Sequence, residues 1–244
     1  KVKLQDEMSD EESYNTEANV NMALKSVYET LREVGLYYNY MLSSMGLSAD
    51  IGYDNSSKEN TVGIYDVVPS DSKILTYWRN LYDGINRANL LLANIDLAKD
   101  LTAEKKDNIY AQALFLRGYF HFMLVVRFQN ICVMTEPYSD LTKGIKQSTA
   151  REAYLQIIKD METAAPLLKP AAELMSPGTV SQSTAYGMLS RVALYMAGYP
   201  IYEPGMYAKA KSYAQKVIDA QYHELNPSFE QFFKTAQAEI FPPI

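Results

Sequence analysis

Apolar residues recur along this chain at the three- and four-residue spacing of amphipathic helices. Between about 75 and 96 the pattern places the following side chains on one helical face: Trp78, Leu81, Tyr82, Ile85, Ala88, Asn89 and Leu92. The same spacing predicts further helices over about 16–34, 103–128, 150–168, 182–197 and 206–220. These helices leave few residues for strands, so the pattern predicts an essentially all-α chain.

Helix starts are marked by side chains that can accept hydrogen bonds from free backbone amides. Thr102 stands directly before the predicted helix 103–128. Thr149 with Glu152, and Ser228 with Gln231, have the spacing of capping boxes, the second opening a short final helix. The stretch 43–74 lacks helical periodicity and is rich in Ser, Gly, Asp and Asn, so it is predicted to be a long loop.

Small residues indicate how the helices pair. The helices 182–197 and 206–220 carry Ala185, Ala193, Ala197, Ala208, Ala210 and Ala214, which allow two helices to approach closely. This composition resembles a tetratricopeptide unit, although the full signature of that repeat is absent. The predicted fold is therefore all-α, with TPR-like antiparallel helix pairs in an α-α superhelix and long inserted loops.

The most apolar stretch, residues 113–134, contains Arg117, His121 and Arg127, which are costly in a lipid environment. It is therefore predicted to be a buried helix of a folded domain. An unpaired charge would be costly there, so Arg117 is predicted to have an internal ionic partner, and His121 to be a hydrogen-bonded core residue.

Composition and motifs exclude several functions. The net charge is -6 without a basic stripe, which argues against nucleic-acid binding. A single cysteine, Cys132, cannot form a disulfide framework or a zinc site. We find no G-x-S-x-G, no H-E-x-x-H and no phosphate-binding glycine loop, so neither an enzyme nor a cofactor or metal site is predicted.

Two segments resemble motifs of the SusD/RagB family. The stretch Trp78 to Asn89 resembles the family's W-x-x-x-Y-x-x-I-x-x-A-N helix, and Ala113 to Phe122 resembles its E-A-x-F-L-R-A-x-x-Y-F segment. Further similar segments are 15–31, 154–164 and 193–220, and their order and spacing hold over about 15–241. The ordered set carries the resemblance. Departures include Gln112, where the family often has Glu.

The resemblance implies a surface lipoprotein of a Gram-negative outer membrane. Such proteins dock on a TonB-dependent SusC-like transporter and hold oligosaccharides or polysaccharides at its mouth, without catalysis; some relatives handle peptides. Residues 1–14 are then an acidic tail, and 15–244 a SusD-like helical domain that lacks the family's C-terminal half. The lipid anchor is expected outside this chain. The alternative is a TPR-like scaffold that binds a peptide or protein in its concave groove.

The candidate ligand-binding residues lie in the loop after the first helix, where the family often places ligand contacts. They are Asp50, Tyr53, Asp54, Asn55 and Tyr65. Tyrosine rings can cover the C–H face of a pyranose, and carboxylates and amides can bind its hydroxyls. The alternatives are an exposed polar loop whose aromatic residues tuck inward, or a cation contact without an EF-hand pattern.

Tyrosine is unusually frequent, with 20 Tyr against 8 Phe and 1 Trp. Tyrosine suits half-buried helix faces and sugar-binding surfaces alike, so composition leaves both open. A first cluster, Tyr37, Tyr38 and Tyr40, is interpreted as a packing or transporter-facing patch. A second, Tyr199, Tyr202 and Tyr207, surrounds a helix-pair turn; it fits packing or a sugar platform, and packing is the favoured interpretation.

Overall fold

The computed structural model describes residues 13–41, 67–68, 70–138, 144–174, 178–224 and 228. Its main helices are α2 (Glu17–Glu29), α4 (Ser72–Asn94), α5 (Ala103–Phe128), α6 (Ala150–Ala164), α7 (Gln182–Ala197) and α8 (Met206–Asp219). Short 3-10 turns cover Thr30–Arg32, Ile95–Leu97, Ala165–Leu167 and Ala171–Glu173. Within the described ranges there is no strand, only an isolated bridge between Ile131 and Ser148. The all-α prediction is confirmed.

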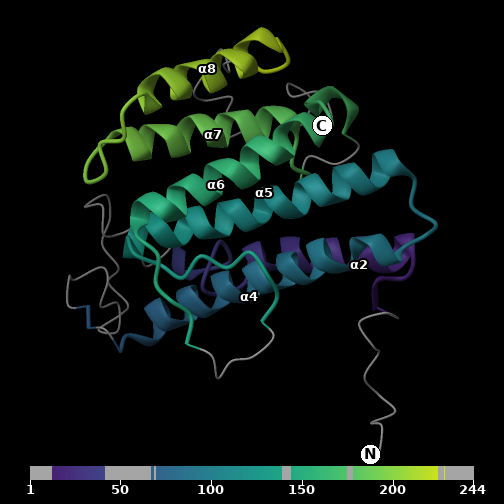
Figure 1. The fold of residues 1–244 in the computed structure, drawn as a ribbon, viewed down its shortest axis with the longest axis horizontal. Helices are drawn as coiled ribbons and strands as arrows, with labels where there is room; N and C mark the ends of the chain where they lie inside the picture. Colours follow the sequence, from purple (N-terminus) through teal and green to yellow (C-terminus); the bar gives the residue numbers. More distant parts are fainter. Residues whose placement is uncertain are drawn as a thin grey trace, which may run out of the picture.

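The helices stack side by side and alternate in direction (Figure 1). The main contacts join α4 to α5, α5 to α6, α6 to α7 and α7 to α8, while α2 packs against both α4 and α5. Each helix therefore lies antiparallel to its neighbour in the sequence, as predicted for a superhelix of helix pairs.

Predicted capping residues begin two of these helices, and Gln231 of the box with Ser228 falls outside the described ranges. Thr102 accepts a hydrogen bond from the amide of Lys105, and Thr149 and Glu152 form the expected capping box. The start of α4 differs from the prediction, which left residues up to 74 in a loop. The carboxylate of Asp71 accepts hydrogen bonds from the amides of Lys73 (2.8 Å) and Ile74 (3.2 Å), so the helix begins at Ser72.

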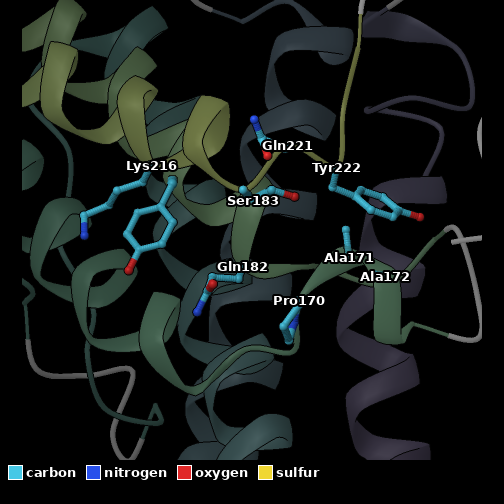
Figure 2. A pocket seen from close by; sticks show the side chains of 10 residues that line it. Pro170, Ala171, Ala172, Gln182, Ser183, Lys216, Gln221 and Tyr222 are labelled. Atoms are coloured by element: carbon cyan, nitrogen blue, oxygen red, sulfur yellow. The ribbon is translucent and has the colours of Figure 1, made fainter.

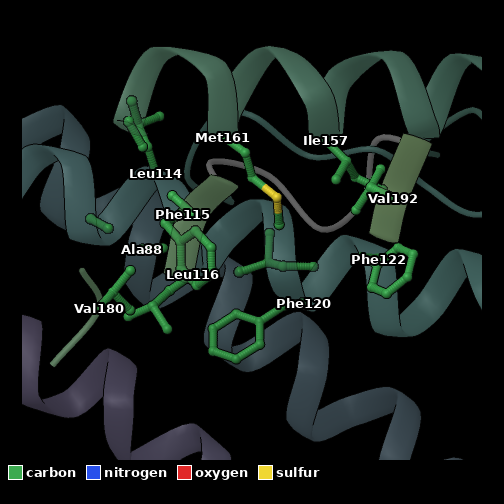
Figure 3. Packing of buried hydrophobic residues seen from close by; sticks show 14 of the residues in the cluster. Ala88, Leu114, Phe115, Leu116, Phe120, Phe122, Ile157, Met161, Val180 and Val192 are labelled. Atoms are coloured by element: carbon green, nitrogen blue, oxygen red, sulfur yellow. The ribbon is translucent and has the colours of Figure 1, made fainter. Parts of the chain in front are cut away.

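Helix α5 is the centre of the core. Nearly every side chain from Ile109 to Val125 is buried, because α2, α4 and α6 cover different sides of the helix. Figure 3 shows Ile157 and Met161 of α6 pointing toward the α5 side chains, with Val192 of α7 beside Ile157. By length and composition α5 could cross a membrane, but 83% of its most apolar window is buried inside the fold. This confirms the prediction of a buried helix.

Several connections gather at one end of the stack, which we call the connection end (Figure 1). The ring of Trp78 near the start of α4 lies 4.8 Å from Phe128 at the end of α5. Arg151 in the first turn of α6 forms an ion pair with Glu203 in the α7–α8 turn. The connection end therefore includes the start of α4, the end of α5, the start of α6 and the α7–α8 turn.

Candidate functional site

The predicted ligand residues Asp50, Tyr53, Asp54, Asn55 and Tyr65 lie outside the residues that the structure describes. Their placement remains a prediction. The flanks of this segment are described: the ammonium of Lys73, in the first turn of α4, lies 5.8 Å from the centre of the Tyr40 ring. The chain therefore leaves and re-enters the described structure at the connection end.

The first tyrosine cluster divides into a packed and an exposed part. The hydroxyl of Tyr37 forms a hydrogen bond with that of Tyr119, and the Tyr119 ring stacks on Phe115 with an interplanar angle of 6°. Burial, followed by the contact with Tyr37, raises the pKa of Tyr119 above its ordinary value, so its hydroxyl stays protonated. Tyr38 is 76% exposed. Tyr37 therefore contacts the helical core through Tyr119 although 37% of it is exposed, whereas Tyr38 faces solvent.

A buried ion pair joins α5 to α6. The guanidinium of Arg117 donates two hydrogen bonds to Asp160, at 2.8 and 2.7 Å, and both side chains are at least nine-tenths buried. Arg117 also donates to the side-chain oxygen of Asn89 and to the carbonyl of Thr135, each at 3.0 Å. The internal partner predicted for Arg117 is thus Asp160. The guanidinium of Arg117 also binds the chain that follows α5, through the carbonyl of Thr135.

The segment 131–136, which we call the pinned segment, has no helix but is bonded at several backbone groups. Asn89 donates to the carbonyls of Met134 (3.2 Å) and Glu136 (2.9 Å). The hydroxyl of Tyr82 lies within 3.0 Å of both the amide and the carbonyl of Cys132. Side chains of the helices therefore satisfy backbone groups that a loop would otherwise expose to water.

His121 completes this network. The amide of Met134 donates to its Nε2 atom at 3.1 Å, so the proton of the neutral ring is on Nδ1, which donates to the carbonyl of Arg117 at 3.0 Å. Burial, together with the charge of Arg117, lowers the pKa of His121 to about 3. The prediction of a satisfied core histidine is confirmed, since both ring nitrogens are occupied by backbone groups.

The second tyrosine cluster is exposed, and its interpretation as packing is wrong. Tyr199 is 80% exposed, and Tyr202 and Tyr207 are each 65% exposed. In the α7–α8 turn it is Ile201 that packs against the core, which leaves the tyrosines on either side facing outward. The rings of Tyr199 and Tyr202 lie 6.1 Å apart at an angle of 76°.

A cavity of about 180 Å³ lies at the opposite end of the stack, between the turn 171–173, the start of α7 and the end of α8 (Figure 2). Its polar groups already have protein partners: Ser183 bonds to Nε2 of His223 at 2.7 Å, and Gln182 donates to the carbonyl of Ala165. In Figure 2, Lys216 and Tyr222 point in opposite directions. The side chains do not converge on one ligand position.

No metal-binding group of three or more His, Cys, Asp or Glu residues occurs in the part of the chain that the structure describes. The sequence did not identify Asp160, whose role in the fold is to pair with the buried Arg117. Asp160 lies between the apolar residues Ile157 and Met161 in the α6 pattern, and a carboxylate at such a position is the available signal for a buried ionic partner.

Comparison with known proteins identifies the family. The sequence profile of the SusD-like proteins, described as "Starch-binding associating with outer membrane", matches residues 3–194. The chain belongs to the SusD-like family. A curated SusD-like protein of Formosa agariphila is 26% identical over 141 residues, which cover 51% of this chain and 25% of that protein.

Solved structures of SusD-like proteins have the same fold. A SusD homolog from Bacteroides thetaiotaomicron superposes with a TM-score of 0.80 and 26% identity, covering 91% of this SusD-like chain and 44% of the homolog. A protein described as a laminarin-binding SusD-like protein superposes with a TM-score of 0.71 and 24% identity, covering 84% and 44%. This SusD-like chain therefore spans a quarter to less than half of the length of these relatives.

Proposed function

We propose that this chain captures glycans for an outer-membrane nutrient uptake system and performs no catalysis. The observation that supports this most is the family match over 3–194, because that family is described as starch-binding and associated with the outer membrane. A structural neighbour that is described as laminarin-binding supports a polysaccharide as the ligand class. In this proposal a TonB-dependent SusC-like transporter receives the glycan, and a lipid group outside this chain anchors the protein to the cell surface.

The helical stack acts as a rigid support for the binding loop. Segment 42–66 is flanked by Tyr40 and by the first turn of α4, which Asp71 fixes at the connection end. Within it, Tyr53 and Tyr65 supply rings for stacking on a pyranose. Asp50, Asp54 and Asn55 supply oxygens and an amide for the hydroxyl groups, which fix the orientation of the sugar.

The test is affinity electrophoresis of the 244-residue chain through gels that contain laminarin or soluble starch, with an inert protein as the mobility reference. We expect selective retardation of the wild type in one gel. Tyr53→Ala and Asp54→Ala are each expected to weaken it roughly tenfold, since one lost ring or charged hydrogen bond is worth about 1.5 kcal/mol.

Met22→Ala is the matched control, because Met22 is 63% exposed on α2 and lies outside segment 42–66. Its retardation should equal that of the wild type. Equal retardation of the wild type, Tyr53→Ala and Asp54→Ala would remove segment 42–66 from the proposal. A wild type that migrates normally in every polysaccharide gel would count against glycan capture by this chain.

A groove between α2, α5 and α7 favours a second candidate, a scaffold that binds a peptide. The groove has a volume of about 280 Å³, and its lining includes Tyr28, Leu31, Phe115, Tyr119, Val180 and Met188. An apolar groove of this kind can accept the side chains of a peptide. Absence of glycan binding, together with selection of one sequence motif from a peptide library, would favour this function.

A further inference from the structure

The α7–α8 turn presents two tyrosine rings to solvent. Tyr199 and Tyr202 are among the most exposed large side chains in the described residues, and their rings meet nearly at a right angle, 6.1 Å apart. The turn's own aliphatic residues do not share this exposure, since Ile201 packs against the core and Met206 is buried. The two rings thus form an exposed aromatic corner on this turn.

The backbone of this turn is strained at one of the two tyrosines. Tyr202 has a φ of 52°, in the left-handed region that a bulky side chain rarely adopts. The amide of Tyr202 donates to the carbonyl of Gly198 at 2.9 Å, and the amide of Glu203 donates to the carbonyl of Met196 at 3.0 Å. A strained residue that its surroundings hold in place is typical of functional positions.

A charged pair fixes Glu203, the residue that follows Tyr202 in the turn. Arg151 donates two hydrogen bonds to the carboxylate of Glu203, at 2.6 and 2.7 Å, which ties the turn to the start of α6. Two of the five N–H groups of the guanidinium are used in this pair, so others remain as donors. The Arg151 side chain is 54% exposed, so these donors are accessible from solvent.

We propose that Tyr199 and Tyr202 form a second carbohydrate-contact site, which takes pyranose rings of a neutral polysaccharide and rests on the proposed glycan-capturing function. One tyrosine face covers the C–H face of a sugar, and the second ring closes the corner at its edge. The phenol hydroxyls and the free N–H groups of Arg151 bind sugar hydroxyls. Glycine would adopt the positive φ at position 202 without strain. The presence of a tyrosine instead is explained in this proposal by the contact that its ring makes with a sugar.

The site lies at the connection end, which also holds Tyr40 and the first turn of α4 on either side of segment 42–66 (Figure 1). The ion pair between Arg151 and Glu203 connects the turn to α6, and Arg117 of α5 connects α6 with α4 through its bonds to Asp160 and Asn89. In this proposal the two contact sites share one support, because the described flanks of segment 42–66 and the α7–α8 turn both belong to the connection end. A single long glycan can reach both, whereas a short oligosaccharide occupies one.

The experiment compares the wild-type chain with the double variant Tyr199→Ala/Tyr202→Gly by affinity electrophoresis in laminarin and soluble starch gels. Glycine at 202 removes the ring and tolerates the positive φ, so the thermal midpoint of the variant should not fall below that of Tyr199→Ala alone. We expect the double variant to bind roughly tenfold more weakly in the gel that retards the wild type, because two ring contacts are lost. Tyr199→Phe/Tyr202→Phe, which keeps both rings, should retain most of the retardation.

Tyr207→Ala is the matched control, because Tyr207 is as exposed as Tyr202 but begins α8 and lies outside the ring pair. It should migrate like the wild type. If the wild type is retarded and the double variant is retarded equally, the second site is overturned while the proposed function stands. If the wild type is not retarded at all, both are overturned. A wild-type dimer that the double variant converts to a monomer, with unchanged retardation, would assign the rings to a self-contact and also overturn the proposal.

Discussion

At the residue scale, the buried ionisable side chains at the centre of the fold have partners that fix their charge. Arg117 is charged and paired with Asp160, whereas His121 is neutral and bonded only to backbone groups. These two states depend on each other, because the charge of Arg117 helps to keep the neighbouring imidazole unprotonated. Protonation of His121 would add a buried positive charge next to the guanidinium of Arg117.

His121 makes the stability of the chain depend on pH. Its pKa is about 3 in the folded chain and near 6.5 when unfolded, so the unfolded chain binds one more proton between these values. This contribution to stability is present above pH 6.5 and is lost as the pH falls toward 3. We expect the free energy of unfolding to fall by about 2 kcal/mol between pH 7 and pH 5, as measured by urea denaturation.

His121→Gln should flatten this dependence, since glutamine can accept the hydrogen bond from Met134 without titrating. Met22→Ala is the control: Met22 is 63% exposed on α2 and carries no titratable group, so its replacement should leave the wild-type slope. An unchanged slope in His121→Gln would contradict the assignment of the lost stability to the buried imidazole.

At the element scale, two glycines on different helices report how closely the helices approach. A Cβ atom at Gly84 of α4 would lie 2.6 Å from Cγ2 of Thr30 and 2.8 Å from Cε2 of Phe120. Gly187 of α7 has open space around its Cβ position. We expect Gly84→Ala to destabilise the chain by about 1–3 kcal/mol through overpacking, and Gly187→Ala to stabilise it by about 0.5–1 kcal/mol.

Urea denaturation of both variants against the wild type measures this difference, and each glycine serves as the control for the other. The changes in unfolding free energy should have opposite signs. Both substitutions improve helix propensity equally, and they differ only in the space around the added Cβ atom. Destabilisation by both variants to the same extent would show that α7 is not free of neighbours at Gly187.

Helix positions were predictable because they depend on local chemistry. The spacing of apolar residues and the capping side chains Thr102 and Thr149 fix where α5 and α6 begin. Asp71 was a missed cap, since the polar sequence around it does not distinguish a cap from a loop residue. The partner of Arg117 and the exposure of Tyr199 depend on contacts between distant segments, which periodicity cannot supply.

At the scale of the whole molecule, the all-α fold and the family followed from the ordered set of segments, and both are confirmed by the structure and the family match. The ligand site was placed by resemblance on Asp50, Tyr53, Asp54, Asn55 and Tyr65, which lie outside the described residues. Side chains in a long loop obey no periodicity, so the sequence alone places a loop but does not bring its residues together.

Two contact sites on one support predict that affinity depends on the length of the glycan. A polymer that occupies both sites gains from an effective concentration at the second site, whereas an oligosaccharide of two or three sugars gains nothing. We expect the polymer to bind at least tenfold more tightly than the short oligosaccharide in isothermal titration calorimetry. For the double variant Tyr199→Ala/Tyr202→Gly, the affinity for the polymer should fall to nearly that for the short oligosaccharide. An unchanged ratio of the two affinities would refute binding across both sites.

The pinned segment gives the connections at this end unequal freedom to vary during evolution. Connections usually accept insertions because their backbone is solvated, and in our proposal the segment 42–66 is the one whose length changes with the glycan. Residues 131–136 cannot, since one added residue would shift Cys132, Met134 and Thr135 away from the side chains that hold them. Related chains should therefore diversify their ligands through the first connection while the second keeps a constant length.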